Sequence, residues 1–369
     1  MIKDTEKIPK YMQIADYFKA QIISGEIISG QQLSTENEIS EKFKVSRHTV
    51  RHALRELEKG VYIYKEQGKG SFCSSRDKNT GIKTIAVLTT YISNYIFPLI
   101  ISGIEEVLSA AGYNLMLLNT NNEKEKEAEY LQKIIANNVV GLIVEPTMSA
   151  YENVNLNWYK ELEKKDIPYI MINAKYDELD PAFVVMDDVE GVYLITKYLL
   201  QLGHRQIAGI FKQDDLQGVN RQLGYKKALE EFGIPFNNEI VSNFGTKEMS
   251  FAPYEFTSNL INKSERPTAI ICYNDQIAAY VLQAIRDAGL RIPEDISVTG
   301  FDDSDIAMAT EFKFTTVSHP KEDMGKRAAR LLINMIEEKI KKPNYVYKPE
   351  LLVRYSTGNV PVKNEVVNL

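Results

Sequence analysis

The sequence is poor in residues that cross-link a protein or anchor it in a membrane. Its two cysteines, Cys73 and Cys272, lie far apart and have no zinc-type spacing, so we expect no disulfide framework. His48 and His52 lie four positions apart, but no third ligand follows at a zinc-like distance. No apolar run approaches the roughly 18 residues that a membrane span needs, and the first residues lack the apolar core of a signal peptide. We therefore expect a cytoplasmic protein with no metal and no membrane partner.

The common catalytic motifs are also missing. The chain contains no GxGxxG after the first strand that we expect beyond residue 82, no phosphate-binding GK[ST] loop, no GxSxG and no HExxH. No nucleophile, metal-ligand or cofactor-binding group of residues stands in their place. We therefore expect that the protein is not an enzyme and carries no cofactor.

The composition is that of an ordinary soluble protein, with an uneven charge. Apolar residues make up 44% and charged residues 25%, and 369 residues favour two or three domains. The net charge is −6, yet residues 1–78 hold 14 Lys and Arg against 11 Asp and Glu, a net +3. The remainder is therefore −9. A basic N-terminal part joined to an acidic remainder indicates that the N-terminal part binds an anionic partner.

Three helices are expected in the first 60 residues. Apolar residues at three- and four-residue steps predict a helix that ends near Gly25. Thr35 and Glu38 have the spacing of a capping box at the start of a second helix, and Ser46 is a good N-cap for a third. At 100° per residue the third helix divides into an apolar face and a basic face; the apolar face holds Val50, Ala53, Leu54 and Leu57, and the basic face holds Arg47, His48, Arg51 and Arg55.

A basic hairpin is expected to follow the three helices. Residues 62–72 alternate, turn through Gln-Gly-Lys-Gly, and return as a strand. Glycine at the tip allows close approach to a DNA backbone or minor groove, with Lys65 and Lys69 nearby. Two short helices with a tight turn, the second presenting arginine, followed by a basic hairpin, indicate a winged helix-turn-helix. A charged, solvated face on a three-helix module is the alternative.

The N-terminal part resembles the GntR-type winged-helix family. The matching motifs are L-S-T-E-N-E-I, V-S-R-H-T-V-R-H-A-L-R-E-L and Q-G-K-G-S-F. Ser34 stands where the family usually has proline, and Gly60-Val61 stands where it usually has Glu-Gly. The resemblance implies operator double-stranded DNA as partner, and it implies contacts from Glu36, Arg47, His48, Arg51, Gln67 and Gly68.

Strands and helices alternate from about residue 83 to residue 357. Short buried strands are expected at 84–88, 115–119, 142–145, 169–173, 207–211, 269–272 and 297–301. Helices are expected between them at 99–110, 128–136, 189–202, 225–232, 277–288 and 324–338. This order predicts parallel sheets covered by helices on both faces, and the length suits two such sheets.

Polar residues follow several of these expected strands, where ligands bind in open α/β sheets. Such carboxylates, amides and one arginine suit a polyhydroxylated ligand, and Phe97 is an aromatic that suits the apolar face of a sugar. Asp275 is as well explained as a helix cap, Asp303 as a brace of its loop, and His319 as a packed structural histidine. The proline that follows Glu145 favours a turn that aims this carboxylate at solvent.

This second part of the chain resembles the LacI/GalR-type effector domain. The matching stretches are I-S-N-Y-I-F-P-L-I-I-S-G-I-E, Q-L-G-H-R-Q-I-A, N-R-Q-L-G-Y, Y-N-D-Q-I-A, P-E-D-I-S-V-T-G-F-D-D and T-T-V-S-H-P-K-E-D-M-G. The resemblance implies two Rossmann-like lobes of the periplasmic-binding-protein kind around a hinge, and a homodimer formed through helix 97–110 and its neighbours. The candidate effector-binding positions are Phe97, Glu145, Asn173, Arg221, Asn274, Asp302 and His319. Five of them stand at or beyond the ends of expected strands: Glu145, Asn173, Arg221, Asn274 and Asp302. The resemblance implies a ligand-facing position for all of the seven except Glu145.

The pairing of these two parts is similar to the arabinose-responsive repressors of Gram-positive bacteria. It implies a DNA-binding repressor that a small sugar, L-arabinose, releases from its operator. The effector could also be another pentose, a hexose or a nucleobase. Two other classes of protein are alternatives: a cytoplasmic sugar-binding protein, and a sugar enzyme with a regulatory N-terminal domain. We expect a winged-helix domain over 1–76, a linker over 77–82, a two-lobed effector-binding and dimerisation domain over 83–357, and a C-terminal tail over 358–369.

Overall fold

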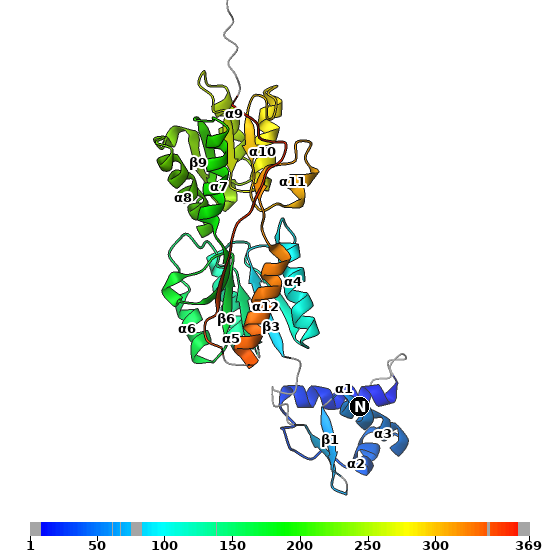
Figure 1. Cartoon of the computed structure of the whole chain (residues 1–369). Helices are drawn as coiled ribbons and strands as arrows, with labels where there is room; N and C mark the ends of the chain where they lie inside the picture. The colour runs from blue at the N-terminus through cyan, green and yellow to red at the C-terminus, as the bar shows by residue number, and fades with distance from the viewer. Residues whose placement is uncertain are drawn as a thin grey trace, which may run out of the picture. The chain divides into compact units, whose positions relative to one another are not determined.

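The computed structural model describes residues 9–60, 62–66, 68–74, 83–137, 139–337 and 340–360. The chain divides into two compact units, Met1–Ile82 and Lys83–Leu369, which we call the head and the body (Figure 1). Gln67, the expected linker over 77–82 and the tail beyond residue 360 lie outside the described residues. No helix in the described ranges is long and apolar enough to cross a membrane.

The head contains the three expected helices, α1 (Lys10–Ser24), α2 (Glu36–Phe43) and α3 (Arg47–Lys59). Gly25 ends α1 in a left-handed conformation, with φ 80°. The capping box is confirmed, because the Glu38 amide donates to Thr35 Oγ1 and the Thr35 amide donates to the Glu38 carboxylate. Ser46 caps α3 as expected. The three helices pack around one apolar core that includes Ile14, Phe18, Ile39, Val50, Leu54 and Leu57.

The expected hairpin is also present, as strands β1 (Ile63–Glu66) and β2 (Gly70–Cys73) paired antiparallel. The segment before α2 lies along β2, because the amide of Leu33 donates to the Ser71 carbonyl and the amide of Cys73 donates to the Gln31 carbonyl. The side chain of Gln32 donates to the Lys69 carbonyl at 2.6 Å. The hairpin is therefore held to the helices by hydrogen bonds as well as by the core.

The body has two lobes, each built on a parallel sheet (Figure 1). The N-lobe (83–187 and 321–347) has a six-stranded sheet in the order β13-β7-β6-β5-β3-β4. Its strands are β3 (Thr84–Thr89), β4 (Asn114–Asn119), β5 (Val139–Val144), β6 (Tyr169–Ile172), β7 (Ala182–Met186) and β13 (Asn344–Tyr347). Its helices are α4 (Phe97–Ala110), α5 (Lys124–Ala136), α6 (Leu156–Lys164) and α12 (Lys321–Glu337), with a short 3-10 helix η1 (Asp177–Leu179).

The C-lobe (188–320 and 348–360) has a four-stranded sheet in the order β11-β10-β8-β9. Its parallel strands are β8 (Ile207–Lys212), β9 (Val241–Phe244), β10 (Ala269–Cys272) and β11 (Ser297–Thr299). Its helices are α7 (Asp188–Gln201), α8 (Leu216–Glu231), α9 (Ala252–Ile261), α10 (Asp275–Asp287) and α11 (Asp305–Ala309), with η2 (Asn238–Ile240) and η3 (Thr246–Glu248). A small antiparallel pair, β12 (Thr316–Val317) and β14 (Leu351–Leu352), completes it.

Alternate residues of each sheet face different helices, as the strand period requires. In β3, Ile85 and Val87 pack with α4 and α12, whereas Ala86 and Leu88 pack with α5 and α6. In the C-lobe the two faces pack on α9 and α10 and on α7 and α8. The fold predicted from the sequence, parallel sheets with helices on both faces, is therefore confirmed.

The body differs from the prediction in its weaker elements and at its end. Strands β7, β9, β12, β13 and β14 and helices α6, α9 and α11 were not predicted. Helix α8 begins at Leu216, nine residues before the predicted start, because Gly218 and Gly224 obscure its pattern. Gly358 belongs to the body and not to a tail, since its carbonyl bonds buried His204 at 3.0 Å.

Candidate DNA-binding surface and ligand pocket

The basic face of α3 is exposed and its apolar face is buried, as predicted. Arg47, His48, Arg51 and Arg55 lie at the surface, while Val50, Ala53, Leu54 and Leu57 are in the core. The N-terminus of α3, which carries Arg47 and His48, also carries the positive end of the helix dipole. The surface therefore combines mobile cations with a fixed partial positive charge.

Glu36 lies beside this face rather than apart from it. The Arg51 Nε donates to the Glu36 carboxylate at 2.8 Å, and the two side chains are 59% and 35% exposed. The pair orients Arg51 only weakly, since an exposed ion pair contributes at most about 1 kcal/mol to folding.

The hairpin tip is exposed, but its lysines are paired. Lys65 contacts Glu58 at 3.0 Å and Lys69 contacts Glu66 at 2.9 Å. Gly68 lies at the surface with φ 80°, and Gly70 has φ 119°, so both depend on glycine's freedom in the left-handed region. Since the ion pairs are exposed, they are weak enough for a phosphate to replace the glutamate.

One pocket lies between the two lobes of the body, at the carboxyl ends of both parallel sheets. Each sheet reverses its strand order there, between β3 and β5 and between β8 and β10, and ligands of open α/β sheets bind at such switch points. All seven residues expected to contact an effector line the pocket: Phe97, Glu145, Asn173, Arg221, Asn274, Asp302 and His319.

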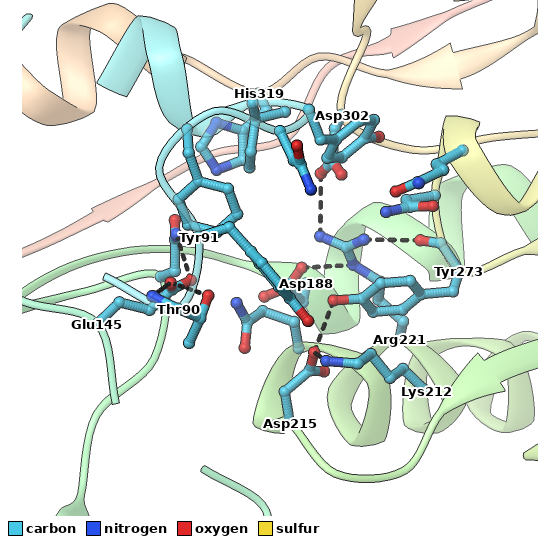
Figure 2. A pocket seen from close by; sticks show the side chains of 18 of the residues that line it. Thr90, Tyr91, Glu145, Asp188, Lys212, Asp215, Arg221, Tyr273, Asp302 and His319 are labelled. Atoms are coloured by element: carbon cyan, nitrogen blue, oxygen red, sulfur yellow. Dashed lines mark hydrogen bonds and ion pairs between the residues drawn. The ribbon is translucent and has the colours of Figure 1, made fainter. Parts of the chain in front are cut away.

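Arg221 is the centre of the C-lobe wall (Figure 2). Its guanidinium donates to Asp188 at 2.8 Å, to Asp302 at 3.1 Å and to the Tyr273 carbonyl at 2.6 Å. The three charged side chains are 3–4% exposed. Burial raises the pKa of Asp188 to about 7 even though Arg221 opposes the shift. Three hydrogen bonds and the Phe301 ring, whose centroid lies 3.7 Å from the guanidinium carbon, hold Arg221 in place before a ligand arrives.

A second ion pair supports the same wall. Lys212, at the end of β8, contacts Asp214 at 3.1 Å and Asp215 at 2.9 Å. Asp215 also accepts from the Tyr273 hydroxyl at 2.8 Å and caps α8 through the Gly218 amide. Burial alone lowers the pKa of Lys212, but the two carboxylates outweigh it and raise that pKa, so the ammonium stays charged.

The N-lobe wall is built around Glu145, and the turn at Pro146 does not aim this residue at solvent. The carboxylate is buried and accepts from the Thr90 amide at 3.0 Å, from the Thr90 hydroxyl at 2.5 Å and from the Asn173 amide group at 2.9 Å. Burial raises its pKa. The expectation of a solvent-directed side chain was wrong because the Thr90 donors turn the carboxylate back toward the pocket (Figure 2).

Three buried polar atoms of pocket-lining residues have no hydrogen-bond partner among the described residues. They are Asn173 Oδ1, Gln217 Oε1 and His319 Nδ1. Buried polar atoms are normally paired, so these three are candidates for ligand contacts. Burial lowers the pKa of His319 to about 4, so its ring is neutral at pH 7 and one of its nitrogens is an acceptor.

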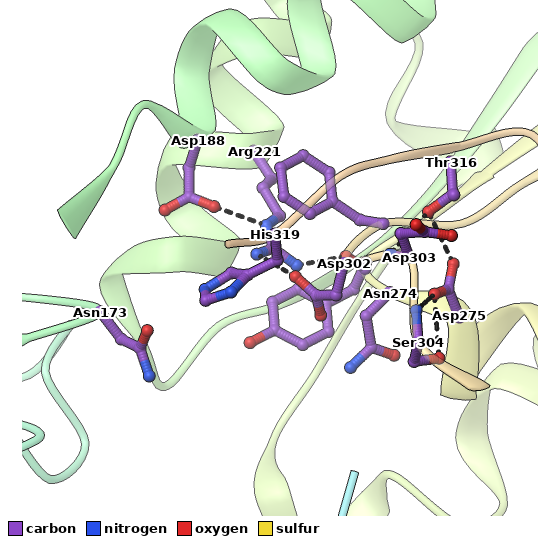
Figure 3. A network of polar contacts seen from close by, with 12 residues as sticks. Asn173, Asp188, Arg221, Asn274, Asp275, Asp302, Asp303, Ser304, Thr316 and His319 are labelled. Atoms are coloured by element: carbon purple, nitrogen blue, oxygen red, sulfur yellow. Dashed lines mark hydrogen bonds and ion pairs between the residues drawn. The ribbon is translucent and has the colours of Figure 1, made fainter. Parts of the chain in front are cut away.

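Two neighbouring aspartates, Asp275 and Asp303, have structural roles outside the Arg221 network, although only Asp303 has the one expected for it (Figure 3). Asp303 pairs with Arg354 at 2.6 Å and braces its loop, as expected. Asp275 does not cap α10, because Asn274 does, through the Ile277 amide. Asp275 instead binds Ser304 and Thr316, at 2.7 and 2.8 Å. Asn274 therefore lines the pocket with its side-chain amide nitrogen available to donate to a ligand.

Several pocket residues were not predicted from the sequence. Thr90, Tyr91 and Tyr95 follow β3, Lys212 ends β8 and Asp215 follows it, and Asp188 follows the unpredicted β7; Gln217 and Tyr273 are further examples. The strand-end rule that found Asn274 also applies to Lys212 and Asp215. Within the described ranges, no three histidine, cysteine or carboxylate groups are arranged to hold a metal ion.

The two units match two family models. Residues 10–73 match the model of bacterial regulatory proteins of the gntR family, and residues 196–357 match the periplasmic binding protein-like domain. A gntR-type head on such a body defines a ligand-responsive transcriptional regulator.

Relatives of the whole chain narrow the class. The chain is 46% identical over 359 residues to the arabinose metabolism transcriptional repressor of Geobacillus stearothermophilus, with 96% of this chain and 99% of the relative covered. It is 44% identical over 362 residues to the repressor of the same name from Halalkalibacterium halodurans, at 95% and 96% coverage. A LacI family regulator from Enterococcus faecium with bound ribose covers 75% of this chain and 99% of its own, at TM-score 0.65 and 28% identity. The chain belongs to the family of arabinose metabolism transcriptional repressors.

Proposed function

We propose that this protein represses genes of L-arabinose use by binding operator DNA through its head, and that L-arabinose in the pocket releases it. The observation that carries the proposal is the chemistry of the pocket, a set of carboxylates, amides and aromatic rings whose two cations are already paired. Because a repressor acts where its operator is, we expect the protein in the cytoplasm.

The pocket favours a neutral polyol. Its four carboxylates, Glu145, Asp188, Asp215 and Asp302, outnumber its two cations, Arg221 and Lys212, and each cation is bound to two carboxylates. A phosphorylated sugar would meet net negative charge and no unpaired cation among the described lining residues. Sugar hydroxyls, in contrast, can donate to the unpaired oxygens of Asn173 and Gln217 and to the neutral ring of His319.

Aromatic rings complete the sugar site. Tyr91 and Phe97 pack edge to face, with their centroids 5.7 Å apart, and both line the pocket. Their carbon faces suit the C–H side of a pyranose ring, while the polar groups opposite them suit its hydroxyls.

Release requires that the ligand favour one state of a two-lobed body. The lobes carry complementary halves of the pocket, with Glu145 and Asn173 on the N-lobe and Arg221 and Asp302 on the C-lobe. A sugar bound to both halves stabilises the closed arrangement. Reciprocity then requires operator DNA to weaken sugar binding by the same factor.

The head would contact DNA through α3 and the hairpin. Arginine forks at the first turns of α3 suit guanine edges or phosphates, and we assign this role to Arg47 and Arg51, with His48 and Glu36 beside them. Gly68, and Gln67 by the family motif, would approach the backbone from the hairpin. These assignments remain predictions.

We also propose a homodimer through the surface of α4 and β4. Leu99 of α4 is 42% exposed, and the edge strand β4, Asn-Leu-Met-Leu-Leu-Asn, has half-buried apolar residues with no further strand beyond it in the described sheet. An apolar sheet edge of this kind needs a cover. Light scattering on the purified chain should give twice the 42.0 kDa monomer mass.

A thermal-shift panel tests the ligand. L-Arabinose, D-ribose, D-xylose, D-galactose, a sugar phosphate and a nucleobase are compared at one concentration. A ligand present at 100 times its dissociation constant adds about 2.7 kcal/mol to the free energy of unfolding. We expect L-arabinose to give the largest shift and the phosphate none; no shift with arabinose and a clear shift with another compound would replace the proposed effector.

A further inference from the structure

Tyr95 has a backbone conformation that is unfavourable for a tyrosine. It lies in the loop between β3 and α4 with φ 59°, in the left-handed region that residues with a Cβ rarely adopt. Such a conformation persists where the surroundings determine it. The ring of Tyr95 packs against the apolar core of the N-lobe, whereas its hydroxyl bonds the other lobe.

The hydroxyl of Tyr95 binds two backbone groups of the C-lobe. It donates to the Phe301 carbonyl at 2.9 Å and accepts from the Asp275 amide at 3.2 Å. Phe301 directly precedes Asp302, and Asp275 directly follows Asn274, so the hydroxyl sits between the two segments that bring these pocket residues into place. Burial raises the pKa of Tyr95 well above its usual value, which keeps the hydroxyl protonated and able to donate.

On the N-lobe side, Tyr95 leads directly into a rigid pair of helices. Phe97 is the first residue of α4 and lines the pocket. Where α4 crosses α12, a Cβ on Gly103 would lie 2.2 Å from the Glu322 carbonyl oxygen, and a Cβ on Gly325 would lie 2.1 Å from that of Ile100. The two helices are thus in backbone contact, and a displacement of the α4 N-terminus moves both rather than being absorbed between them.

We propose that the Tyr95 hydroxyl is the positioning group that ties lobe closure to the start of α4, while Lys321 at the start of α12 makes its own bonds to the Asp302 and Asp303 carbonyls, at 2.6 and 2.8 Å. When the lobes close on a sugar, the hydroxyl docks on Phe301 and Asp275 and draws the start of α4 with it; when they open, the contact is lost. This inference rests on the proposed function, because it concerns how the same sugar drives release. Other inter-lobe bonds, such as Asn122 to Thr246 at 2.7 Å, close the cleft without touching α4.

The test is Tyr95→Phe in the full-length chain, which removes only the hydroxyl. Tyr113→Phe is the matched control, since the buried Tyr113 hydroxyl donates to Glu337 at 2.7 Å within the N-lobe. Isothermal titration gives the arabinose dissociation constant, and anisotropy of labelled operator gives affinity without sugar and the arabinose concentration for half release. Circular dichroism melting without sugar verifies that both variants fold.

We expect Tyr95→Phe to bind operator like the parent without sugar, to bind arabinose about 2- to 12-fold more weakly, the effect of one hydrogen bond, and to need at least that much more arabinose for release. Tyr113→Phe should match the parent in all three. The inference is overturned if Tyr95→Phe equals the parent in both sugar measurements, or if the control loses as much. If the parent itself binds no arabinose, the proposed function fails instead, and this outcome is seen before any variant is compared.

Discussion

The head and the body use charge in opposite ways. The arginines of α3 are exposed and form at most a loose pair, as between Arg51 and Glu36, whereas Arg221 is 4% exposed and bound to two buried carboxylates. An exposed cation costs the fold little and remains available to a phosphate. A buried one is part of the fold, because removing it leaves its partners charged in a medium of low polarity. Substitutions of charged residues in the head should therefore change DNA binding without changing stability. Substitutions of buried charged residues in the body should change both ligand binding and stability.

Arg221→Ala should have the largest effect on stability of the substitutions that compare the two units. It leaves Asp188 and Asp302 without a counter-charge, and breaking one partner of a buried pair costs about 3–5 kcal/mol. We expect a drop of that size in the free energy of unfolding by urea denaturation, with loss of arabinose binding. Arg286→Ala, which removes an exposed pair with Glu311, is the control and should change stability by less than about 1 kcal/mol. Equal effects of the two variants would contradict the account of the pocket.

His319 should make the body sensitive to acid. Its pKa is lowered from 6.5 to about 4 by burial, so between these values the unfolded state binds more protons and stability falls as the pH falls. The difference between the two pKa values corresponds to about 3 kcal/mol of stability. Asp188 and Asp275, whose pKa burial raises to about 7, act in the opposite direction.

These carboxylates are common to the parent and to His319→Gln, so the difference between the two proteins isolates the histidine. We expect the parent to lose up to about 3 kcal/mol more than the variant between pH 6.5 and pH 4 by denaturant unfolding. Parallel stability curves for the two proteins would show that the ring is already charged in the fold.

Arg47→Ala and Arg51→Ala should affect function alone. Each lost bidentate contact weakens operator binding by about 1–3 kcal/mol, while stability and arabinose affinity stay near the parent's because both side chains are exposed. Lys59→Ala, at the far end of the same helix, is the control. Gel shifts at fixed salt that show unchanged operator affinity for both arginine variants would remove α3 from the interface.

Glu36→Gln, in the head, should have the smallest effect on stability. The change removes the ion pair with Arg51 but keeps a hydrogen-bond acceptor, so the free energy of unfolding should change by about 0.5 kcal/mol or less. If Glu36 positions Arg51, operator affinity should fall by a measurable factor while stability does not. A change in melting temperature without a change in operator affinity would assign Glu36 to the fold.

The head could be predicted almost completely from the sequence because its signals are local. The capping pair Thr35 and Glu38, the N-cap Ser46 and the two faces of α3 each depend on spacings of a few residues. The strand-end rule likewise located Asn173, Asn274 and Asp302. The partners of Arg221 could not be predicted, since Asp188 lies 33 residues away and Asp302 lies 81 residues away, and only the sheet topology brings them together. Tyr95 gave no signal because its role comes from a backbone conformation and a contact across the cleft.

The most direct test of the central claim is the release of operator by L-arabinose. An operator fragment selected by its binding to the sugar-free protein is labelled, and its anisotropy is followed as arabinose is added, beside a calorimetric titration of the free protein. We expect anisotropy to fall to that of free DNA, with a half-release concentration at or above the calorimetric dissociation constant, as reciprocal coupling requires. Operator that stays bound at arabinose concentrations that saturate the protein would contradict the account.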